Sequence, residues 1–450
     1  MKLEILIYDA LVSLSKAHTR EEAFSPNFDT AKSGRQMSVS GATENKIKLV
    51  SSALLKLNWP GSIKLDLKEH HNLVKKAVVE RYDNFLNFGT LPCTIRYLLP
   101  AYLKGEIKQL VAEFSSTLPR DFTCHLPAAL TGLEGHGPFV IGPVTISKSS
   151  DWIDSIDFPP SALDYMGVDN SDWRENLKAA LVDKDLQLKP LSASLYEVVT
   201  KSKCMISVTT AGYGKALSRK LSTILARTAL DSASLISGNP KYFRSFTLYT
   251  ERRPPILTHS IVETNGFLWN TGLALSDEVN PFLLRPQDLD QSHIKFFEAV
   301  SKILTGLIGN SDGCPGLCQR WSTALDWHGE ACREVSDQIA IAKFGTCLDV
   351  LSSGGGKTRA ISKMVSNLTK IPEDKIVANY DGDLTLYETI TKIYEYGRSE
   401  ILHGNKVDRM TSFEALRGIS EFFSKIALIK SALAFLTYSG SDSAKAFSDM

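Results

Sequence analysis

Two residues near the C-terminus have side chains suited to cleaving a phosphodiester. In the segment YEYGRSEILHGN, Arg398 precedes His403 by five positions. Histidine accepts and donates protons near neutral pH, and a guanidinium binds phosphate oxygens through paired hydrogen bonds. Without a metal, the histidine would deprotonate a ribose 2′-hydroxyl, the oxygen would attack the adjacent phosphorus, and the arginine would stabilise the developing charge. This route selects RNA, because DNA lacks the hydroxyl.

The spacing of this pair limits how the two side chains meet. Five residues along an ideal helix correspond to a rotation of roughly 140°, so the side chains do not share one face. Either the helix distorts at its end, which Gly404 would permit, or each side chain meets its counterpart across a dimer. The alternative is a surface arginine and a histidine that faces the negative end of a helix dipole.

The whole segment around this pair resembles the Apea-like branch of the HEPN family, over residues 318–436. The features appear in order: a helix with two tryptophans, a second helix (IAKFGTCLDVL) with an acidic residue in its last turn, a glycine-bearing loop, a third helix, and the ending YGRSEILHG. The residues concerned are Trp321, Trp327, Tyr394, Gly397, Arg398, Ser399, His403 and Gly404.

The resemblance implies an all-α bundle that dimerises and brings two Arg-x4–6-His motifs into one cleft. Many such domains are metal-independent endoribonucleases of toxin–antitoxin, abortive-infection and phage-defence systems. Arg398 would then bind the scissile phosphate, and His403 would be the general base or acid. Ser399 matches the polar residue that commonly follows the arginine. Asp349 occupies the place of a glutamate that orients the arginine, and is one methylene shorter.

Three nearby residues are candidates for substrate binding. Tyr394 shares a helical face with Arg398 and could stack on a base. The alternative, which is favoured, is that the Tyr394 ring packs between helices. Asn405 could contact substrate or complete the turn after Gly404. It also stands where some toxins of this family have a tyrosine that a partner modifies, so regulation by that route is not expected. Arg409 could contact a phosphate or cap a loop.

Two glycine-containing segments invite a nucleotide-binding interpretation. AGYGKALS has only Gly212 and Gly214, whereas the dinucleotide fingerprint needs three spaced glycines. SSGGGKTRA lacks the first glycine of a P-loop, since Leu351 stands there. We therefore expect a tight strand-to-helix turn in the first segment and a helix stop at Gly354–Gly356 in the second. An NTPase that uses Gly354–Lys357 is the least favoured function.

The composition is typical of a globular protein without disulfides. The chain has 450 residues, 51 basic and 50 acidic, and a net charge of +1. A net charge this small produces no long-range electrostatic field that would attract nucleic acid or an anionic membrane. The local basic spots are Arg252–Arg253 and a helix face with Lys215, Arg219, Lys220 and Arg227.

Seven cysteines favour a reducing cytoplasm. Cys314 and Cys318, with His328 and Cys332 downstream, match no zinc module, so we expect neither metal nor cofactor. No signal peptide or membrane span is expected.

We expect a multidomain, mixed fold. Residues 1–125 are mainly helical, with a mobile polar loop at 25–45 and helices over 74–86 and 102–118. Residues 126–315 are α+β, with strands at 138–147, 203–210, 243–251, 256–264 and 267–275. Residues 316–440 form a bundle with five helix candidates, and 441–450 are a flexible tail.

Two functions of different class follow from these patterns. The first is an RNA-cleaving effector, cytoplasmic and homodimeric through the HEPN bundle, whose N-terminal regions bind a regulatory protein or ligand. The second is a non-catalytic dimerisation or nucleotide-binding module. Residues 316–450 contain 16 basic and 17 acidic residues and are therefore nearly neutral. This favours the second function, because RNA affinity depends largely on cationic contacts.

Overall fold

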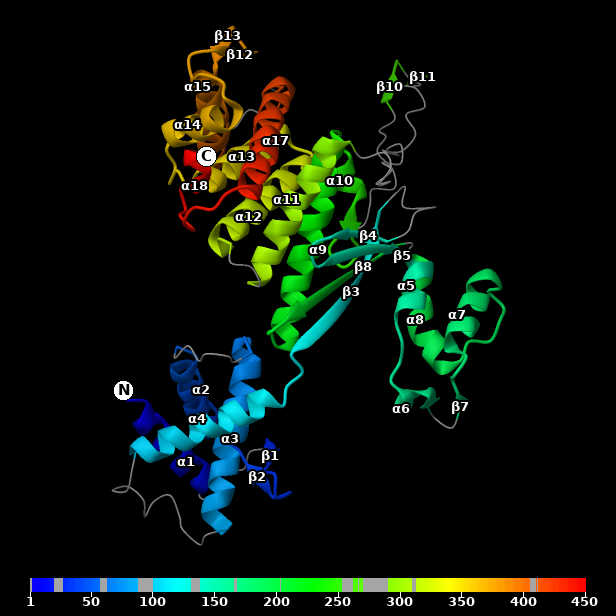
Figure 1. Cartoon of the computed structure of the whole chain (residues 1–450), viewed down its shortest axis with the longest axis vertical. Coiled ribbons are helices and arrows are strands. Elements are labelled where there is room, and N and C mark those ends of the chain that lie inside the picture. Colours follow the sequence, from blue (N-terminus) through cyan, green and yellow to red (C-terminus); the bar gives the residue numbers. More distant parts are fainter. Residues whose placement is uncertain are drawn as a thin grey trace. The chain divides into compact units, whose positions relative to one another are not determined.

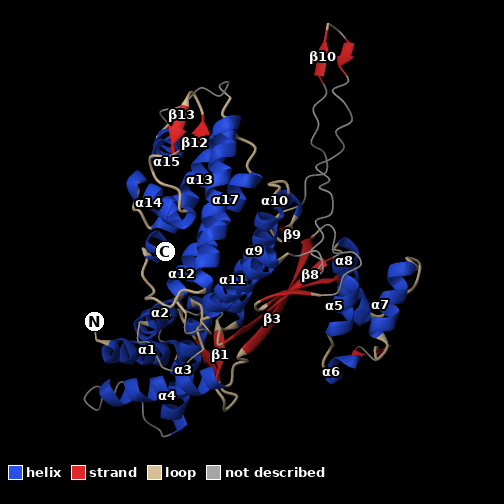
Figure 2. Ribbon diagram, turned by 45° about the horizontal axis from the view of Figure 1, so that its top comes forward, coloured by secondary structure: helices blue, strands red, loops and turns tan. Residues whose placement is uncertain are grey.

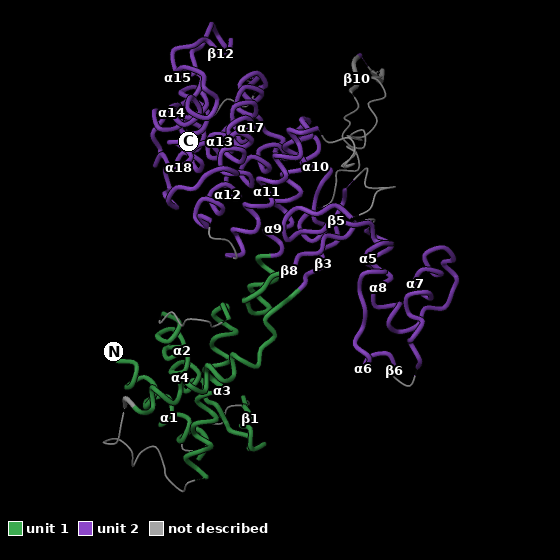
Figure 3. Tube along the Cα trace, in the orientation of Figure 1, with its two compact units in different colours: residues 1–122, 210–221 green, residues 123–209, 222–450 purple. Residues whose placement is uncertain are grey.

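The computed structural model divides the chain into two compact units (Figure 3). The first comprises residues 1–122 and 210–221, and the second comprises residues 123–209 and 222–450. The structure describes residues 2–19, 27–56, 63–87, 100–130, 138–165, 168–202, 204–252, 262–265, 267–269, 290–309, 313–404, 410 and 412–450.

The first unit is built from four helices around one apolar core (Figure 1). These are α1 (Leu3–His18), α2 (Gly41–Leu55), α3 (Leu67–Asn87) and α4 (Pro100–Ser116). Apolar residues recur at three- and four-residue intervals, as in Val74, Ala77, Val78 and Tyr82, and these side chains are buried together. The helices predicted over 74–86 and 102–118 are thereby confirmed.

The segment 25–45 is folded where it is described, and our prediction of a mobile loop was wrong. Strands β1 (Phe28–Thr30) and β2 (Gln36–Ser38) form an antiparallel hairpin, and α2 begins at Gly41. Two buried carboxylates of α3 hold the hairpin: Glu80 accepts from the Lys32 backbone N–H at 2.8 Å, and Asp83 pairs with Arg35 at 2.8 Å. Most polar side chains of the hairpin are nevertheless exposed, so these contacts rather than burial hold it in place.

The second unit contains a five-stranded sheet in the order β4-β5-β8-β3-β9. The strands are β3 (Asp121–Ala129), β4 (Phe139–Ile141), β5 (Val144–Lys148), β8 (Cys204–Ala211) and β9 (Thr247–Leu248). The hairpin predicted at 138–147 and the strand at 203–210 are confirmed. The strand predicted at 243–251 was wrong over most of its length, because α10 (Tyr242–Ser245) precedes a strand of two residues.

Short helices follow β5 and lead back to β8 (Figure 2). They are α5 (Ser149–Ser155), α6 (Pro160–Leu163), α7 (Trp173–Val182) and α8 (Pro190–Lys201), with a small β6 (Asp164–Tyr165)–β7 (Val168–Asp169) hairpin. They pack around Trp152 and Trp173. After β8 comes the long helix α9 (Lys215–Ser237). Within the predicted strands at 256–264 and 267–275, β10 (Val262–Thr264) pairs with β11 (Phe267–Trp269); the remaining residues lie outside the described ranges.

The C-terminal part of this unit is helical apart from one small hairpin. Its elements are α11 (Gln291–Ile308), α12 (Pro315–Arg333), α13 (Asp337–Ser352), α14 (Thr358–Thr369), β12 (Ile376–Asn379), β13 (Asp383–Thr385), α15 (Leu386–Thr391), η3 (Lys392–Ser399), α16 (Glu400–Leu402) and α17 (Glu414–Leu436). Helix α11 packs on α12 and α17, so the bundle begins earlier than the expected residue 316. Trp321 is fully buried, and its indole N–H donates to the Leu428 carbonyl at 3.0 Å.

The last ten residues pack on this bundle, and our prediction of a flexible tail was wrong. The carboxylate of Asp442 accepts from the Gly316 and Leu317 backbone N–H groups at the start of α12, at 2.8 and 2.9 Å. A short helix, α18 (Ala446–Asp449), follows, and its Phe447 is fully buried. A carboxylate at a helix N-terminus and a buried aromatic side chain both stabilise this arrangement.

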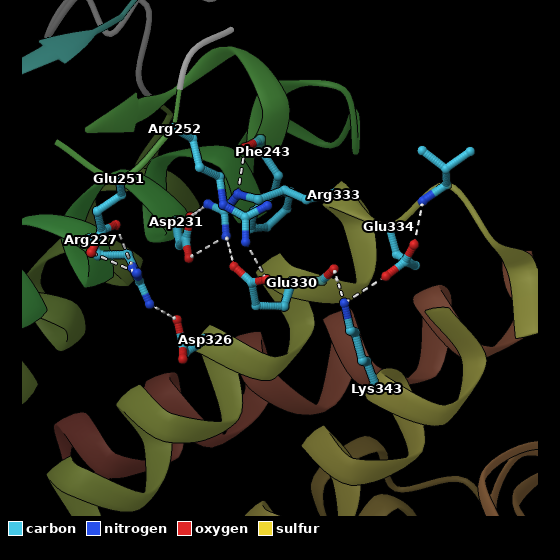
Figure 4. A network of polar contacts seen from close by, with 11 residues as sticks. Arg227, Asp231, Phe243, Glu251, Arg252, Asp326, Glu330, Arg333, Glu334 and Lys343 are labelled. Atoms are coloured by element: carbon cyan, nitrogen blue, oxygen red, sulfur yellow. Dashed lines mark hydrogen bonds and ion pairs between the residues drawn. The ribbon is translucent and has the colours of Figure 1, made fainter. Parts of the chain in front are cut away.

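A network of charged side chains joins α9 and the segment after β9 to the bundle (Figure 4). Arg227 of α9 pairs with Glu251 at 2.6 Å and with Asp326 of α12 at 2.7 Å. Arg252 pairs with Glu330, and Arg333 pairs with Asp231. The α+β part and the helical bundle therefore share polar contacts within one unit, and of these ion pairs Arg333–Asp231 is buried.

This network changes the interpretation of both basic spots. Arg227 and Arg252 are neutralised by carboxylates, and Arg253 lies outside the described residues. In the N-terminal half of α9, Lys215, Arg219 and Lys220 are exposed. Among the helices that the structure describes, none combines the length and apolarity needed to cross a membrane.

Candidate functional site

The helix that carries Arg398 departs from α-helical geometry. A capping box formed by Thr385 and Glu388 starts α15, and the chain then adopts a π-helix over Lys392–Ser399, closed by a bond from the Glu400 N–H to the Glu395 carbonyl. Such π segments are rare and occur frequently at functional sites. The α register returns at once, since the His403 N–H donates to the Ser399 carbonyl at 3.0 Å. The distortion thus includes Arg398 and Ser399, and only Glu400–Leu402 of the interval up to His403 is α-helical.

Two glycines allow this helix to approach α13 closely. A Cβ atom at Gly345 would lie 2.9 Å from the Cβ of Arg398, and a Cβ at Gly397 would overlap Ile341. Neither contact is compatible with a larger residue unless the helices separate. The pair Gly345–Gly397 therefore determines how deeply the first atoms of the Arg398 side chain enter the bundle.

A chain of hydrogen bonds fixes the guanidinium of Arg398. Arg398 Nη1 donates to the Tyr394 hydroxyl at 3.0 Å, and that hydroxyl donates to Asp349 Oδ2 at 3.3 Å. The guanidinium carbon lies 5.1 Å from the centre of the Tyr394 ring, a cation–π distance. Burial and the Asp349 carboxylate raise the pKa of Tyr394, so the hydroxyl keeps the proton that it donates. Arg398 Nε is buried and has no hydrogen-bond partner among the described residues.

This geometry revises two of the expected roles. The link from Asp349 to Arg398 runs through the hydroxyl of Tyr394. Tyr394 is only 4% exposed, so its ring has no free face on which a base could stack. The packed interpretation of Tyr394 is the one that the structure favours.

The glycine-rich segment after α13 is a helix stop, as predicted. Helix α13 ends at Ser352, and Ser353, Gly355 and Gly356 follow with φ of 51°, 57° and 82°. The Gly356 N–H donates to Asp349 Oδ1 at 3.1 Å, and a Cβ at Gly356 would lie 3.2 Å from the Tyr394 hydroxyl. One loop amide thus binds a carboxylate of the protein itself, which argues against a P-loop.

The AGYG segment is a strand-to-helix turn whose following helix already has an anionic partner. Gly212 has φ of 80°, and the Ala216 N–H at the start of α9 donates to Glu69 Oε1 at 2.9 Å. A carboxylate at the helix N-terminus takes the place that a bound phosphate would need. This supports the interpretation of the segment as a turn.

The remaining site residues differ in how the structure presents them. His403 is exposed in the last turn before Gly404, and Ser399 is half-buried. Among the described residues, no hydrogen bond joins the side chains of Arg398 and His403. Asn405 and Arg409 lie outside the described ranges. The structure therefore groups Arg398, Tyr394 and Asp349, and leaves His403 in solvent.

The cysteine and histidine side chains set aside as a possible metal site belong to the bundle interior or its edge. Cys314 and Cys318 stand at the start of α12, whereas His328 and Cys332 lie together in the core, 3.6 Å apart between Nε2 and Sγ. Burial raises the pKa of Cys332 far above its usual range, so this thiol is unreactive. Within the described part of the chain, no group of three or more potential ligands could hold a metal ion.

Sequence reasoning missed three contributors to the site. Gly345 and Ile341 pack against the π-helix, and Glu395 accepts from the Thr358 hydroxyl at 2.6 Å, which ties the glycine loop to the same helix. Gly397 had been noted only as part of a motif. A glycine inside an otherwise amphipathic helix is a signal of close helix approach, and Gly345 carries that signal.

Comparison of the chain with protein-family models, with curated proteins and with solved structures gave no match.

Proposed function

We propose that the protein is a metal-independent endoribonuclease of HEPN type. The observation that carries this proposal is the guanidinium of Arg398, which is held by Tyr394 and Asp349 while its Nε remains without a partner. The Nε atom itself is buried, whereas the guanidinium as a whole is only half-buried, so a phosphate would approach the pre-oriented group from its solvent side. The exposed His403 in the next turn supplies the proton acceptor.

The proposed reaction uses only side chains of the protein and the RNA itself. His403 accepts the proton of a 2′-hydroxyl, and the 2′-oxygen forms a bond to the adjacent phosphorus. The bond from phosphorus to the 5′-oxygen breaks, and that oxygen takes a proton from a second, protonated His403. Arg398 stabilises the charge on the phosphate oxygens. The products carry a 2′,3′-cyclic phosphate and a 5′-hydroxyl.

A second copy of the chain supplies the second histidine in this proposal. Because Arg398 and His403 lie on different faces of one helix, two copies that face each other would complete the site. We further propose that the enzyme acts in the cytoplasm as a toxin or phage-defence effector. The network of Figure 4 would couple the α+β part, which binds a regulatory protein or ligand, to the bundle.

One observation favours a second function, a non-catalytic binding or dimerisation module. Residues 316–450 contain 16 basic and 17 acidic residues, so the bundle lacks the excess of cations that RNA-binding surfaces usually have. In that case Arg398, Tyr394 and Asp349 would serve as a structural contact between helices.

A cleavage assay separates the two functions. The purified protein, Arg398→Ala and His403→Ala are incubated with end-labelled RNA in the presence of EDTA, with Lys430→Ala, an exposed position of α17, as the control. Each site variant should lose at least about 100-fold in rate, and Lys430→Ala should cleave like the wild type. A 2′-deoxy substitution at the scissile position should block cleavage. If the wild type does not cleave, or if all variants cleave equally, the binding module is the better description.

A further inference from the structure

The last ten residues of the chain pack where α13 ends and α14 begins. We name residues 441–450 the strap. Its short helix α18 contacts α14 and α13, and lies beside α14 in Figure 1. Phe447 of the strap is fully buried, and its ring centre lies 6.4 Å from that of Phe435 in α17. The strap therefore contacts both helices that flank the glycine-rich segment after α13.

Ser448 of the strap joins α13 to α14 through two hydrogen bonds. Its hydroxyl donates to the carbonyl of Ser352, the last residue of α13, at 3.0 Å. Its own carbonyl accepts from the side-chain amide of Asn367 in α14 at 2.6 Å. The last carbonyls of a helix have no partner within the helix, and Ser352 is buried. The Ser448 hydroxyl thus satisfies a helix end and connects it to the next helix.

The loop between these two helices encloses the carboxylate of Asp349. Ser352 Oγ donates to the Asp349 carbonyl and accepts from the Gly354 N–H, both at 3.1 Å. The Gly356 N–H donates to Asp349 Oδ1 at 3.1 Å. A Cβ at Gly354 would lie 2.9 Å from Ser352 Oγ and 3.2 Å from the Cβ of Ala360 in α14. The loop is therefore tightly folded, and the place of the carboxylate depends on the separation of its two ends.

Both sides of this loop contact the helix that carries Arg398. On one side, Asp349 Oδ2 accepts from the Tyr394 hydroxyl, which accepts from Arg398 Nη1. On the other side, the hydroxyl of Thr358 at the start of α14 donates to Glu395 Oε1 at 2.6 Å. A change in the separation of α13 and α14 would therefore move the groups that hold the guanidinium.

We propose that Ser448 is a positioning residue for Arg398. Its two hydrogen bonds fix the separation of α13 and α14, the loop between these helices places Asp349, and Asp349 orients the guanidinium through Tyr394. The inference rests on the proposed function, in which Arg398 stabilises the charge on the phosphate. Loss of the Ser448 hydroxyl loosens the guanidinium, which lowers kcat because orientation is lost.

Removal of one hydroxyl tests this role in the full-length protein. Ser448→Ala should lower kcat for RNA cleavage by up to about fivefold, the equivalent of one hydrogen bond, and leave KM unchanged. Ser448→Thr keeps the hydroxyl and should restore kcat. The matched control is Ser441→Ala, at an exposed serine of the strap whose hydroxyl forms no hydrogen bond with the described residues, and it should cleave like the wild type.

A double variant separates positioning from a general effect on the fold. In the Tyr394→Phe background the bridge to Asp349 is absent, so Ser448→Ala should cause no further loss of kcat. Circular dichroism checks that every variant is folded. Unchanged kcat in Ser448→Ala, equal losses in Ser448→Ala and Ser441→Ala, or additive losses in the double variant would overturn the proposal.

The NMR signal of the Arg398 Nε–H group provides a readout that does not depend on cleavage. Burial of Nε slows exchange of its proton with water, and Arg398→Lys assigns the signal. Ser448→Ala should shift this signal, and Ser441→Ala should not. If the wild type does not cleave RNA but the signal responds to Ser448→Ala, the nuclease proposal fails while Ser448 still positions Arg398. A signal that is unchanged in Ser448→Ala overturns the positioning role.

Discussion

The hydroxyl of Tyr394 is the atom that determines where the guanidinium of Arg398 points. It accepts from Arg398 and donates to Asp349, and it is held between two helices by burial of its ring. Tyr394 touches no reacting atom in the proposed reaction, so it is a positioning residue. An arginine with one rotamer loses less entropy when it binds a phosphate than an arginine free to rotate.

Replacing Tyr394 with phenylalanine tests this role. Tyr394→Phe keeps the buried ring and removes the bridge, so we expect RNA cleavage to fall by up to about tenfold, the equivalent of one hydrogen bond, with little change in melting temperature. Tyr387→Phe, at an exposed ring of α15, should leave both unchanged. KM and kcat are measured separately, because loss of orientation should lower kcat. Equal kinetics for wild type and Tyr394→Phe would contradict the role.

At the scale of elements, the crossing of α13 and the π-helix depends on residues without side chains. Gly345 and Gly397 lie where a Cβ would meet Arg398 or Ile341. Gly418 of α17 is also helical, but no heavy atom lies within 4 Å of its expected Cβ. Replacement of glycine by alanine should therefore have opposite effects on the stability of the bundle at Gly397 and at Gly418.

We expect Gly397→Ala to destabilise the bundle and Gly418→Ala to stabilise it. The first forces overlap with Ile341, at a cost of about 1–3 kcal/mol, and shifts Arg398. The second gains the helix propensity of alanine, up to about 1 kcal/mol. Urea unfolding of both variants measures the difference. Destabilisation of similar size at both positions would show that the close approach is not what Gly397 provides.

A buried histidine gives the bundle a dependence on pH. His328 Nδ1 lies 2.8 Å from the Ser424 hydroxyl. Burial, assisted by Lys425 and Arg333, lowers the pKa of His328 to about 3. The unfolded chain, with a pKa of about 6.5, binds a proton below that pH, and the folded protein does not until far lower pH. Stability from this group is therefore present above about pH 6.5 and is lost as the pH falls below it.

Comparison with His328→Leu isolates this effect. Between pH 7 and pH 5, the free energy of unfolding of the wild type should fall by about 2 kcal/mol relative to that of the variant. The other titrating groups contribute equally to the free energy of unfolding of both proteins, so their contributions cancel in this comparison. Urea titrations at the two pH values, followed by circular dichroism, provide the measurement. A difference that does not change with pH would mean that His328 is protonated or accessible in the folded protein.

Periodicity predicted most long helices, because their apolar faces repeat over many residues, as in α3 and α9. It failed where polar contacts with distant residues hold a segment in place. The segment 25–45 and the last ten residues look like loops in sequence, and they are held by Glu80, Asp83 and Asp442, whose partners are far away in the chain. Spacing placed Tyr394 on one helical face with Arg398, but no sequence period reveals the π-helix that contains both residues.

At the scale of the whole molecule, the second unit is held together by ion pairs of very different burial. Asp231 and Arg333 are 1% and 7% exposed, whereas Asp326 and Arg227 are 43% and 33% exposed. Burial raises the pKa of Asp231 to about 6. A Cβ at Gly329 would lie 2.6 Å from Asp231 Oδ2, so a glycine makes room for this carboxylate between α9 and α12. The contact between the α+β part and the bundle depends on the buried pair.

Removing one charge from each pair separates their contributions. Asp231→Asn leaves Arg333 charged and buried, and we expect a loss of about 3–5 kcal/mol. Asp326→Asn removes a half-exposed partner from Arg227, which keeps Glu251, and should cost less than about 1 kcal/mol. The free energy of unfolding is measured in urea at pH 8, well above the pKa of about 6 of Asp231. A small loss in Asp231→Asn would show that the apolar contacts of α9 hold the two parts together without the ion pair. RNA cleavage by both variants is then compared with the wild-type rate. If only a folded Asp231→Asn variant cleaves at a different rate, the buried pair also transmits regulation to Arg398.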